Sequence, residues 1–424
     1  MIKKVAVIGL GYVGLPTYVA LKKTNLYDVV GYTRSQKKVD NINRGVSPID
    51  DADVEEYLKN HKVKVTNKQK DLKGADVFII CVPTPVKDDY VPDYGPVISA
   101  TELVAPFIKK GSHYILESTV NPGTCEEIVL PILETLSRLR AGKDFNIAHC
   151  PERINPGDRK WNIYNINRNV GSINHKMNRE IAEFYRSFIK DAKINEVGSL
   201  KVAEATKIVE NAFRDINIAY VNELAQSFDA MGIDLIETLK ASSNKPFAFL
   251  THWPGAGVGG HCIAVDPYYL IRRASLSGFN HQFLKLAREI NNNMPSYTVR
   301  RLVQALNQVG LSVKKTKITL LGLSYKPNIG DLRESPAFEI EKLLKKLAAD
   351  LTVYDPFVPG KIKSLKQAID KAEAIVIATS HRQFIKELPK LLPKSKVKVI
   401  IDGRNCLNKK EIEKLQIIYK GIGR

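Results

Sequence analysis

Several features that define specialised protein classes are missing from this chain. No apolar run reaches the ~18 residues that a membrane-spanning helix requires, and no low-complexity tract or short-period repeat is present. Cysteine is scarce: the 424 residues contain 5, far apart and without a CxxC pair. That pattern argues against a disulfide or zinc framework and favours a reducing compartment. We therefore expect a cytoplasmic globular protein with no metal and no membrane partner.

The beginning of the chain imitates a secretion signal without having its structure. Two lysines precede an apolar stretch, but Gly9, Gly11 and Gly14 interrupt that stretch, and no small-residue cleavage site follows. We interpret the stretch as a first buried strand.

Acidic residues are outnumbered, with 64 Lys and Arg against 45 Asp and Glu, which gives a net charge of +19. A basic balance suits nucleic acid, anionic lipid or a phosphorylated small molecule. The basic residues are scattered, with no long block and no recognition-helix or zinc signature. A lysine-rich solvated surface is the preferred interpretation, and we expect no nucleic-acid partner.

Strand and helix signals alternate at both ends of the chain. Buried-strand runs occur at 4–8, 29–32, 75–82 and 114–117, and again at 317–322, 351–354, 374–378 and 397–401. Such alternation predicts βαβ crossovers and parallel sheets. Between the two ends, residues 199–231 contain no Gly or Pro and repeat apolar residues at helical spacing, which predicts a helix of ~50 Å.

The predicted fold class is therefore α/β, with two Rossmann-like domains joined by a helical central domain. We expect boundaries at 1–198, 199–305 and 306–424, because a chain of this length holds two or three domains of ~150 residues. The long helix suggests a spine between domains, a subunit interface, or both.

The first strand runs into Gly9-Leu10-Gly11-Tyr12-Val13-Gly14, a GxGxxG pattern. In a strand–turn–helix context Gly9 permits the tight turn, Gly11 lets a pyrophosphate approach the backbone, and Gly14 allows close helix–sheet packing. The helix N-terminus then faces the anion. This pattern predicts a dinucleotide site.

The second strand should end in an acid that binds the adenosine ribose, yet Thr33 and Arg34 stand there. An arginine at this position accepts a 2′-phosphate or stacks on adenine, and it is equally compatible with a plain surface charge. The expected cofactor is NAD, with NADP left open.

The segment 255–266 places Cys262 after four glycines within six residues. A backbone rich in glycine wraps a ligand closely. If a helix begins near Cys262, Asp266 lies one turn along on the same face, and the helix N-terminus favours the thiolate. Cys262 is thus a candidate nucleophile, while a lone cysteine is often a small buried hydrophobe.

Polar residues gather elsewhere too. Lys207 and Asn211 stand four residues apart on the long predicted helix, with Glu204 on the same side. Polar groups on an apolar helix need partners or a cleft, although exposed ion pairs would also explain them. Segments 117–124 and 150–157 follow strands or contain prolines, and strand-end loops are where ligands bind in parallel sheets.

Together these motifs resemble the UDP-glucose/GDP-mannose dehydrogenase family over nearly the whole chain. The matches, in order, are 9–14, 117–120, 151–153, Lys207 with Asn211, 259–262 with Asp266, 322–328, 331–336 and 402–405. Segments 151–158, 214–224 and 260–270 resemble the UDP-N-acetylhexosamine branch. Segment 151–158 is more similar to the N-acetylglucosamine enzymes than to the N-acetylmannosamine ones.

The resemblance implies an NAD-dependent four-electron oxidation of a C6 alcohol to a uronate, through a thiohemiacetal and a thioester on Cys262. It implies catalytic roles for Cys262, Lys207, Asn211, Asp266, Thr119 and Glu152. It implies cofactor contacts from Gly9, Gly11, Tyr12, Val13, Gly14, Thr33, Arg34, Thr84, Thr119 and Arg333. It implies substrate contacts from Glu152, Arg153, Lys207, Asn211, Arg214, Gly259, Lys326 and Arg404.

The resemblance also implies a homodimer through the long helix and a role in making surface polysaccharide. The preferred substrate is UDP-N-acetyl-D-glucosamine, with UDP-N-acetyl-D-mannosamine and then UDP-glucose as alternatives. Two other functional classes stay open on the residues alone. A two-electron dehydrogenase would need no thiol and would yield one NADH per substrate. A nucleic-acid binder would show steeply salt-dependent affinity.

Overall fold

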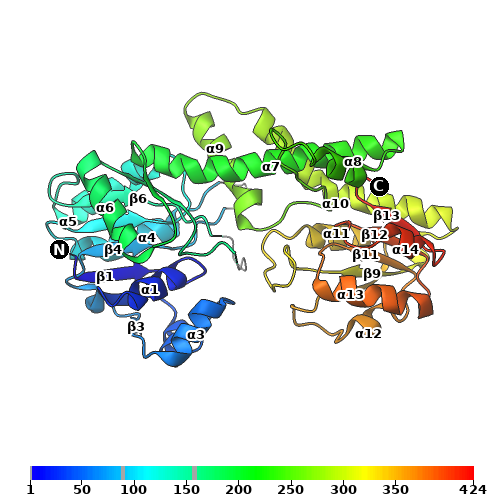
Figure 1. Cartoon of the computed structure of the whole chain (residues 1–424), viewed down its shortest axis with the longest axis horizontal. Helices are drawn as coiled ribbons and strands as arrows, with labels where there is room; N and C mark the ends of the chain where they lie inside the picture. The colour runs from blue at the N-terminus through cyan, green and yellow to red at the C-terminus, as the bar shows by residue number, and fades with distance from the viewer. Residues whose placement is uncertain (1, 87–90, 155–159) are drawn as a thin grey trace. The chain divides into compact units, whose positions relative to one another are not determined.

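A computed structural model describes residues 2–86, 91–154 and 160–424 (Figure 1). The chain divides into two compact units. The first comprises Met1–Glu210 and Tyr268–Ser277, and the second comprises Asn211–Pro267 and Gly278–Arg424. Of the segment 151–158 used for the resemblance, residues 155–158 lie outside the described residues.

The first unit is built on an eight-stranded sheet. In spatial order its strands are β3 (Val65–Thr66), β2 (Asp28–Tyr32), β1 (Lys4–Ile8), β4 (Val77–Ile80), β5 (His113–Leu116), β6 (Asn146–His149), β7 (Arg168–Ser172) and β8 (Ile194–Glu196). Strands β1 to β6 pair in parallel. The order reverses direction at β1, with β2 on one side and β4 on the other, which is the switch point where such sheets bind ligands.

Both faces of this sheet are buried. Side chains alternate along β1, so Val5 and Val7 join one apolar cluster while Ala6 and Ile8 join another. The α-helices that lie wholly within this unit are α1 (Gly14–Lys23), α2 (Gln36–Asn43), α3 (Ala52–Asn60), α4 (Gly95–Val104), α5 (Leu130–Ser137) and α6 (His175–Phe188). A sheet covered on both faces is the expected three-layer α/β arrangement.

One part of the sheet departs from the all-parallel prediction: β7 runs antiparallel to β6. Parallel neighbours need a crossover, usually a helix. The described residues between these two strands form turns rather than a helix. An antiparallel neighbour needs no such crossover, and β7 lies alongside β6. This return matters for the site because β7 begins with the fully buried Arg168.

The predicted long helix is confirmed as α7, Leu200–Met231, with 32 residues, or ~48 Å at 1.5 Å per residue. Three further helices follow α7 along the chain. The first two are α8 (Leu235–Ser242) and α9 (His261–Leu276). The third, α10 (Phe283–Gln308), leads into the second sheet.

The second unit holds a five-stranded parallel sheet. Its spatial order is β10 (Asp350–Tyr354), β9 (Lys317–Leu321), β11 (Ala374–Ile377), β12 (Val399–Asp402) and β13 (Ile418–Gly421). Helices α11 (Pro336–Lys346), α12 (Leu365–Ile369), α13 (Arg382–Leu391) and α14 (Lys409–Glu413) complete it. Apolar clusters again lie on both faces of the sheet, so the predicted class of two α/β domains and a long central helix is confirmed. Among the described residues, no helix is both long and apolar enough to cross a bilayer.

Candidate functional site

The glycine turn after β1 has the geometry that its sequence predicts. Gly9 adopts φ +94°, and a Cβ there would lie 2.7 Å from the carbonyl oxygen of Cys81. A Cβ on Gly14 would lie 2.0 Å from the carbonyl oxygen of Gly9, so the helix and the turn touch. A Cβ on Gly11 would meet nothing within 4 Å. The turn is thus closed at Gly9 and Gly14 and open above Gly11.

Helix α1 begins at this turn without a side-chain cap, since Val13 at its N-cap makes no capping hydrogen bond. Uncapped amides at a helix N-terminus attract an anion. The Val13 side chain is half-buried and that of Tyr12 is exposed. The space above Gly11 and the lack of a side-chain cap at Val13 fit a pyrophosphate in this place.

Other predicted cofactor residues lie at carboxyl ends of neighbouring strands of the same sheet. Thr33 follows β2 and donates its backbone N–H to the Thr66 oxygen at 3.0 Å, while Arg34 is exposed. Thr84 follows β4 and is buried, and its carbonyl oxygen accepts a hydrogen bond from the Tyr269 hydroxyl. Thr119 follows β5 and is half-buried. Strands that end at one edge gather these residues there.

Glu152 is held by contacts that its sequence neighbourhood does not reveal. Its Oε1 accepts hydrogen bonds from the backbone N–H groups of Arg153 at 2.6 Å and Ile154 at 2.8 Å. Its Oε2 forms an ion pair of 2.5 Å with Arg168. The side chain is buried, and the carboxylate is fixed at both oxygens. A catalytic role for Glu152 would depend on Arg168, which sequence reasoning missed.

Arg168 serves a second carboxyl group as well. Its Nη1 lies 3.8 Å from Glu117, whose Oε1 also accepts a hydrogen bond from the Tyr185 hydroxyl at 2.6 Å. Burial raises the pKa of Glu117, against the lowering effect of the Arg168 charge. One guanidinium therefore lies among two buried carboxyl groups. A single arginine at the start of a strand-like run is the only sequence signal for this cluster.

Arg153 is half-buried, and its guanidinium already has protein partners. Its guanidinium pairs with the two carboxylate oxygens of Glu210 at 3.1 and 2.6 Å, and donates to the carbonyl oxygen of Asn167 at 2.8 Å. A substrate contact by Arg153 would have to share these partners. Lys207 differs: its side chain is 9% exposed, and its ammonium has no partner among the described residues. A lysine this buried, with no hydrogen bond or ion pair to another described residue, suits an anionic or oxyanionic ligand.

Glu204 joins α7 to the loop after β5. One of its carboxylate oxygens accepts the backbone N–H of Cys125 at 2.7 Å, and the other accepts that of Gly123 at 2.5 Å. Burial raises the pKa of Glu204 to about 7 despite these hydrogen bonds. Glu204 and Lys207 are both nearly buried, so the alternative of exposed helix ion pairs is wrong for both.

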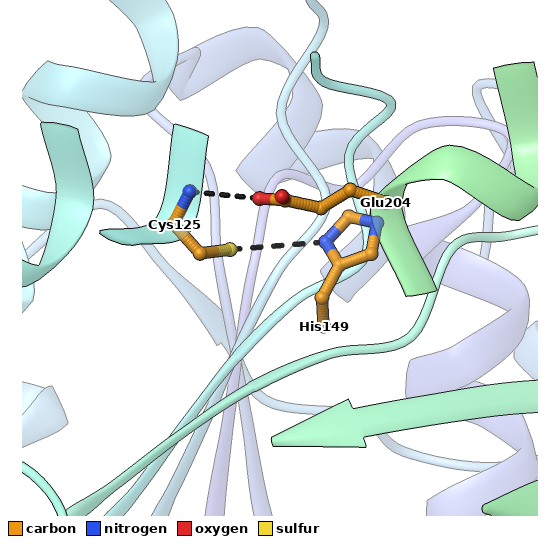
Figure 2. A group of neighbouring side chains, drawn as sticks. All are labelled: Cys125, His149 and Glu204. Carbon is orange, nitrogen blue, oxygen red and sulfur yellow. Dashed lines mark hydrogen bonds between the residues drawn. The ribbon is translucent and has the colours of Figure 1, made fainter. Parts of the chain in front are cut away.

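Within the described part of the chain, one group of side chains could hold a metal ion: Cys125, His149 and Glu204, whose ligand atoms lie within 4.8 Å of one another. Figure 2 shows the Cys125 sulfur facing Nδ1 of His149, 4.0 Å away. Burial raises the pKa of the Cys125 thiol and lowers that of His149 to about 3. As it stands, the group is a neutral thiol and a neutral imidazole beside a carboxyl already engaged by two amides.

In the second unit two predicted catalytic residues meet. The Asn211 amide donates to Oδ2 of Asp266 at 2.5 Å, and both side chains are buried. Helix α9 begins at His261, so Asp266 lies one turn after Cys262, as predicted. Cys262 itself is exposed. An exposed thiol in the first turn of a helix has the setting of a reactive cysteine rather than of a structural one.

The glycines before Cys262 pack closely against the protein itself. Their expected contact with a ligand stays a prediction. A Cβ on Gly259 or Gly260 would lie 2.6 to 2.7 Å from Tyr325 side-chain atoms, and a Cβ on Gly255 would lie 2.7 Å from the Arg404 guanidinium. These glycines let the cysteine-bearing loop lie directly on segments 322–336 and 403–404.

Arg333 also contacts the loop that carries Cys262. Its backbone oxygen accepts the N–H of Gly260 at 3.0 Å, and its guanidinium pairs with Asp331 at 2.6 Å. Hydrogen bonding to Asp331 raises the pKa of Arg333, and the charge of Cys262 adds to the rise. The guanidinium is thus within electrostatic range of the Cys262 side chain. We predicted Arg333 beside the cofactor phosphates, and that role stays a prediction.

The remaining predicted substrate residues lie on the second sheet and on α7. Lys326 is half-buried in the loop after β9. Arg404 follows β12 and donates from Nε to the Ala378 oxygen at 2.8 Å, and burial lowers its pKa. Arg214 is exposed on α7.

The chain matches known proteins along most of its length. Models of one family match at 3–189 (UDP-glucose/GDP-mannose dehydrogenase family, NAD binding domain), 201–293 (central domain) and 319–409 (UDP binding domain). The chain belongs to the UDP-glucose/GDP-mannose dehydrogenase family. The resemblance seen in its motifs is thereby confirmed, and the protein is a nucleotide-sugar dehydrogenase.

Individual members of this family are similar over their full length. A UDP-N-acetyl-D-mannosamine dehydrogenase of Pyrococcus horikoshii is 38% identical over 99% of both chains. A UDP-N-acetyl-D-glucosamine 6-dehydrogenase of Pseudomonas aeruginosa is 36% identical over 90% of this chain and 91% of its own. The solved UDP-D-ManNAc dehydrogenase of Pyrococcus horikoshii superposes with a TM-score of 0.93, 37% identity and 99% coverage of both chains.

For this dehydrogenase the cofactor is NAD, since the matched N-terminal model is an NAD binding domain. The residues present fit that group, because Gly11 leaves space above the turn and the amides of α1 carry no side-chain cap. The acid that usually binds the ribose is still absent at Thr33 and Arg34. The family match therefore supports NAD over NADP, a choice that the glycine motif alone left open.

Proposed function

We propose that the protein oxidises the primary alcohol at C6 of a UDP-N-acetylhexosamine to the carboxylate, in two two-electron steps, with Cys262 holding the sugar between them. The observation that carries this proposal is the exposed thiol of Cys262 in the first turn of α9, one turn before the Asp266–Asn211 pair. Full-length similarity to enzymes named for UDP-N-acetylhexosamines supports the substrate class.

The chemistry follows from the reactivity of an aldehyde. Loss of a hydride and a proton from the alcohol gives an aldehyde at C6. The Cys262 thiolate adds to that carbon, and the oxygen takes up a proton, which forms a thiohemiacetal. Loss of a second hydride and a proton gives a thioester, and water cleaves it to the carboxylate and the free thiol. NAD⁺, when bound, would accept one hydride in each oxidation, so a second NAD⁺ has to replace the first NADH between the two steps. Covalent capture prevents escape of the aldehyde between the two steps.

Other residues stabilise the developing negative charge, transfer protons and bind the substrate. Lys207 and Asn211 stabilise the oxyanion at C6, a contribution of ~3–4 kcal/mol for a well-placed donor. Thr119, Glu152 and Asp266 move protons and orient water. Lys326 and Arg404 contact the UDP-sugar, with Arg153, Arg214 and Gly259 as further contacts. Lys207 is 9% exposed, and its ammonium bonds to no other described residue, which supports its assignment to the C6 oxyanion.

The identity of the sugar is the finer part of the proposal. Segment 151–158 favours UDP-N-acetyl-D-glucosamine. UDP-N-acetyl-D-mannosamine is a second candidate, favoured by the relative that is 38% identical over 99% of the chain. UDP-glucose comes after both. The product would be a UDP-N-acetylhexosaminuronate, a precursor for polysaccharide.

The test is a panel of UDP-N-acetylglucosamine, UDP-N-acetylmannosamine, UDP-N-acetylgalactosamine and UDP-glucose, each with NAD⁺. We expect one N-acetylhexosamine to be used and two NADH to form per sugar. One NADH per sugar would support the two-electron alternative and overturn the proposal. A DNA titration at physiological salt should be flat, whereas a steeply salt-dependent affinity would support the nucleic-acid alternative.

We also propose that the chain forms a homodimer through α7. Phe213 and Tyr220 stand two turns apart on one face of α7 and are half-exposed, as is Leu286 on α10. Exposed large apolar side chains on one face are typical of interfaces. Sedimentation equilibrium should give a dimer that Phe213→Glu with Tyr220→Glu converts to a monomer, while Leu347→Glu, similarly exposed on another helix end, leaves it dimeric. A monomeric wild type, or a dimeric double variant, would contradict this.

A further inference from the structure

The loop that carries Lys326 is held at its start by one carboxylate. Asp355 follows β10, and its Oδ2 accepts hydrogen bonds from the backbone N–H groups of Leu323 at 2.7 Å and Ser324 at 2.9 Å, and from the Ser324 hydroxyl at 2.9 Å. Asp355 and Ser324 are buried. Three donors on one oxygen fix the backbone two and three residues before Lys326.

The same loop is held at its far end by a histidine. The N–H of Asn328 donates to Nδ1 of His381 at 2.9 Å, and the Asn328 side-chain oxygen accepts the N–H of Arg382 at 3.0 Å. Asn328 adopts φ +63°, a left-handed conformation that surrounding contacts must maintain. These contacts fix the backbone two residues after Lys326.

The two holding groups also bond to each other. Nε2 of His381 lies 3.0 Å from Oδ2 of Asp355. Because Nδ1 accepts from Asn328, the neutral ring carries its proton on Nε2 and donates it to Asp355. The His381 ring is wholly buried, stacked on Phe357 and edge-on to Phe384, with centroids 5.1 Å away in each case. The ring has no freedom to turn while this packing persists.

The geometry excludes a different interpretation of these residue types. In a Ser-His-Asp triad the serine and the aspartate bond to opposite ring nitrogens. Here Ser324 and Asp355 both face Nε2 of His381, at 3.2 and 3.0 Å, and the serine donates to the aspartate. The serine is not a nucleophile, and the trio is a support for the loop. Burial alone would raise the pKa of Asp355, but hydrogen bonds from His381 and from backbone amides hold it well below its usual range.

We propose that Asp355 and His381 are positioning residues that hold loop 323–328 in the conformation from which Lys326 binds the UDP-sugar. The inference rests on the proposed function, because it takes Lys326 as a substrate contact. Without either residue, Lys326 samples other positions, and the apparent affinity falls by the fraction of time spent in the competent one. A loop competent for about a tenth of the time would raise the Kd for UDP about tenfold.

The experiment measures binding of UDP, and separately of NAD⁺, to the full-length protein by calorimetry. His381→Ala should raise the Kd for UDP about tenfold and leave the Kd for NAD⁺ within about twofold of wild type. His381→Asn keeps an acceptor near Nδ1 and should recover part of the loss. The matched control is Thr319→Val, which removes a buried hydroxyl bond to Ala368 of 2.8 Å in the same sheet and should leave UDP binding unchanged.

A double-mutant cycle separates positioning from general damage. Lys326→Ala should itself weaken UDP binding, and adding His381→Ala to it should change the Kd by less than about twofold, since the residue being positioned is gone. A folded His381→Ala variant with wild-type affinity for UDP would overturn the proposal, and so would additive losses in the cycle. If His381→Ala does not fold, Asp355→Asn takes its place in the same cycle.

The loop support and the proposed function fail in different ways. Wild-type protein that binds no UDP would refute the substrate class. The support is checked without any ligand by nitrogen NMR of histidine-labelled protein, in which His381 should carry its proton on Nε2. A proton on Nδ1 would overturn the support whatever UDP does.

Discussion

The Asn211 amide donates a 2.5 Å hydrogen bond to the Asp266 carboxylate. The first residue lies on α7 and the second on α9, one turn after Cys262. The pair ties α9, which carries the candidate nucleophile in its first turn, to the long central helix. It also orients a buried carboxylate, which is what a group that moves protons requires.

The substitution Asp266→Asn tests that role while preserving shape. The oxygen of the introduced amide can still accept the bond from Asn211, so we expect a folded protein that binds UDP normally. Removal of the base should lower kcat by about 10²–10⁴-fold. Steady-state kinetics with the preferred sugar gives the answer. A wild-type kcat in the Asp266→Asn variant would show that Asp266 is not the base.

The glycine turn offers a matched pair of substitutions. Gly14→Ala places a Cβ 2.0 Å from the Gly9 oxygen, and such overpacking should cost about 1–3 kcal/mol of stability or more. Gly11→Ala meets nothing within 4 Å, so the protein should fold normally. Its Cβ would occupy the space left for the dinucleotide, and the Kd for NAD⁺ should rise at least about tenfold, or ~1.4 kcal/mol. Thermal unfolding and NAD⁺ titration distinguish the two effects, and a Gly11→Ala variant with normal NAD⁺ affinity would contradict the placement.

Several parts of this structure could be predicted from sequence because they depend on local patterns. Strand β1, the glycine turn and α7 each follow from apolar periodicity and the positions of glycine and proline. The role of glycines 255–260 could not be predicted, because it depends on Tyr325 and Arg404, distant in the chain. The antiparallel β7 and the buried Arg168 were missed for the same reason. Nothing local marks Arg168 as the partner of Glu152.

Arg168→Met should show how much that partnership stabilises the first unit. The substitution leaves Glu152 buried without its cation, and losing one partner of a buried pair costs about 3–5 kcal/mol. Urea denaturation measures the loss. Arg186→Met is the control, since Arg186 pairs with Glu183 and Glu196 at the surface, and such pairs contribute about 1 kcal/mol or less. Equal small losses in both variants would contradict a structural charge at Arg168.

Glu204 makes the stability depend on pH. Its pKa is about 7 in the folded protein against an ordinary value of 4.5, so the folded state binds more protons between these values. Its contribution is therefore greatest at low pH and declines as pH rises from about 4.5 to 7. The free energy of unfolding of wild type relative to Glu204→Gln should fall between pH 5 and pH 8. A difference that grows with pH would show that the two amide bonds to Gly123 and Cys125 outweigh burial.

The most direct test of the whole account is uronate formation by a Cys262→Ala variant. We predict that the variant binds NAD⁺ and UDP as the wild type does, and that it forms no detectable UDP-hexuronate in the time the wild type completes the reaction. Uronate produced at the wild-type rate would contradict the thioester route, because no covalent step through Cys262 could then be required.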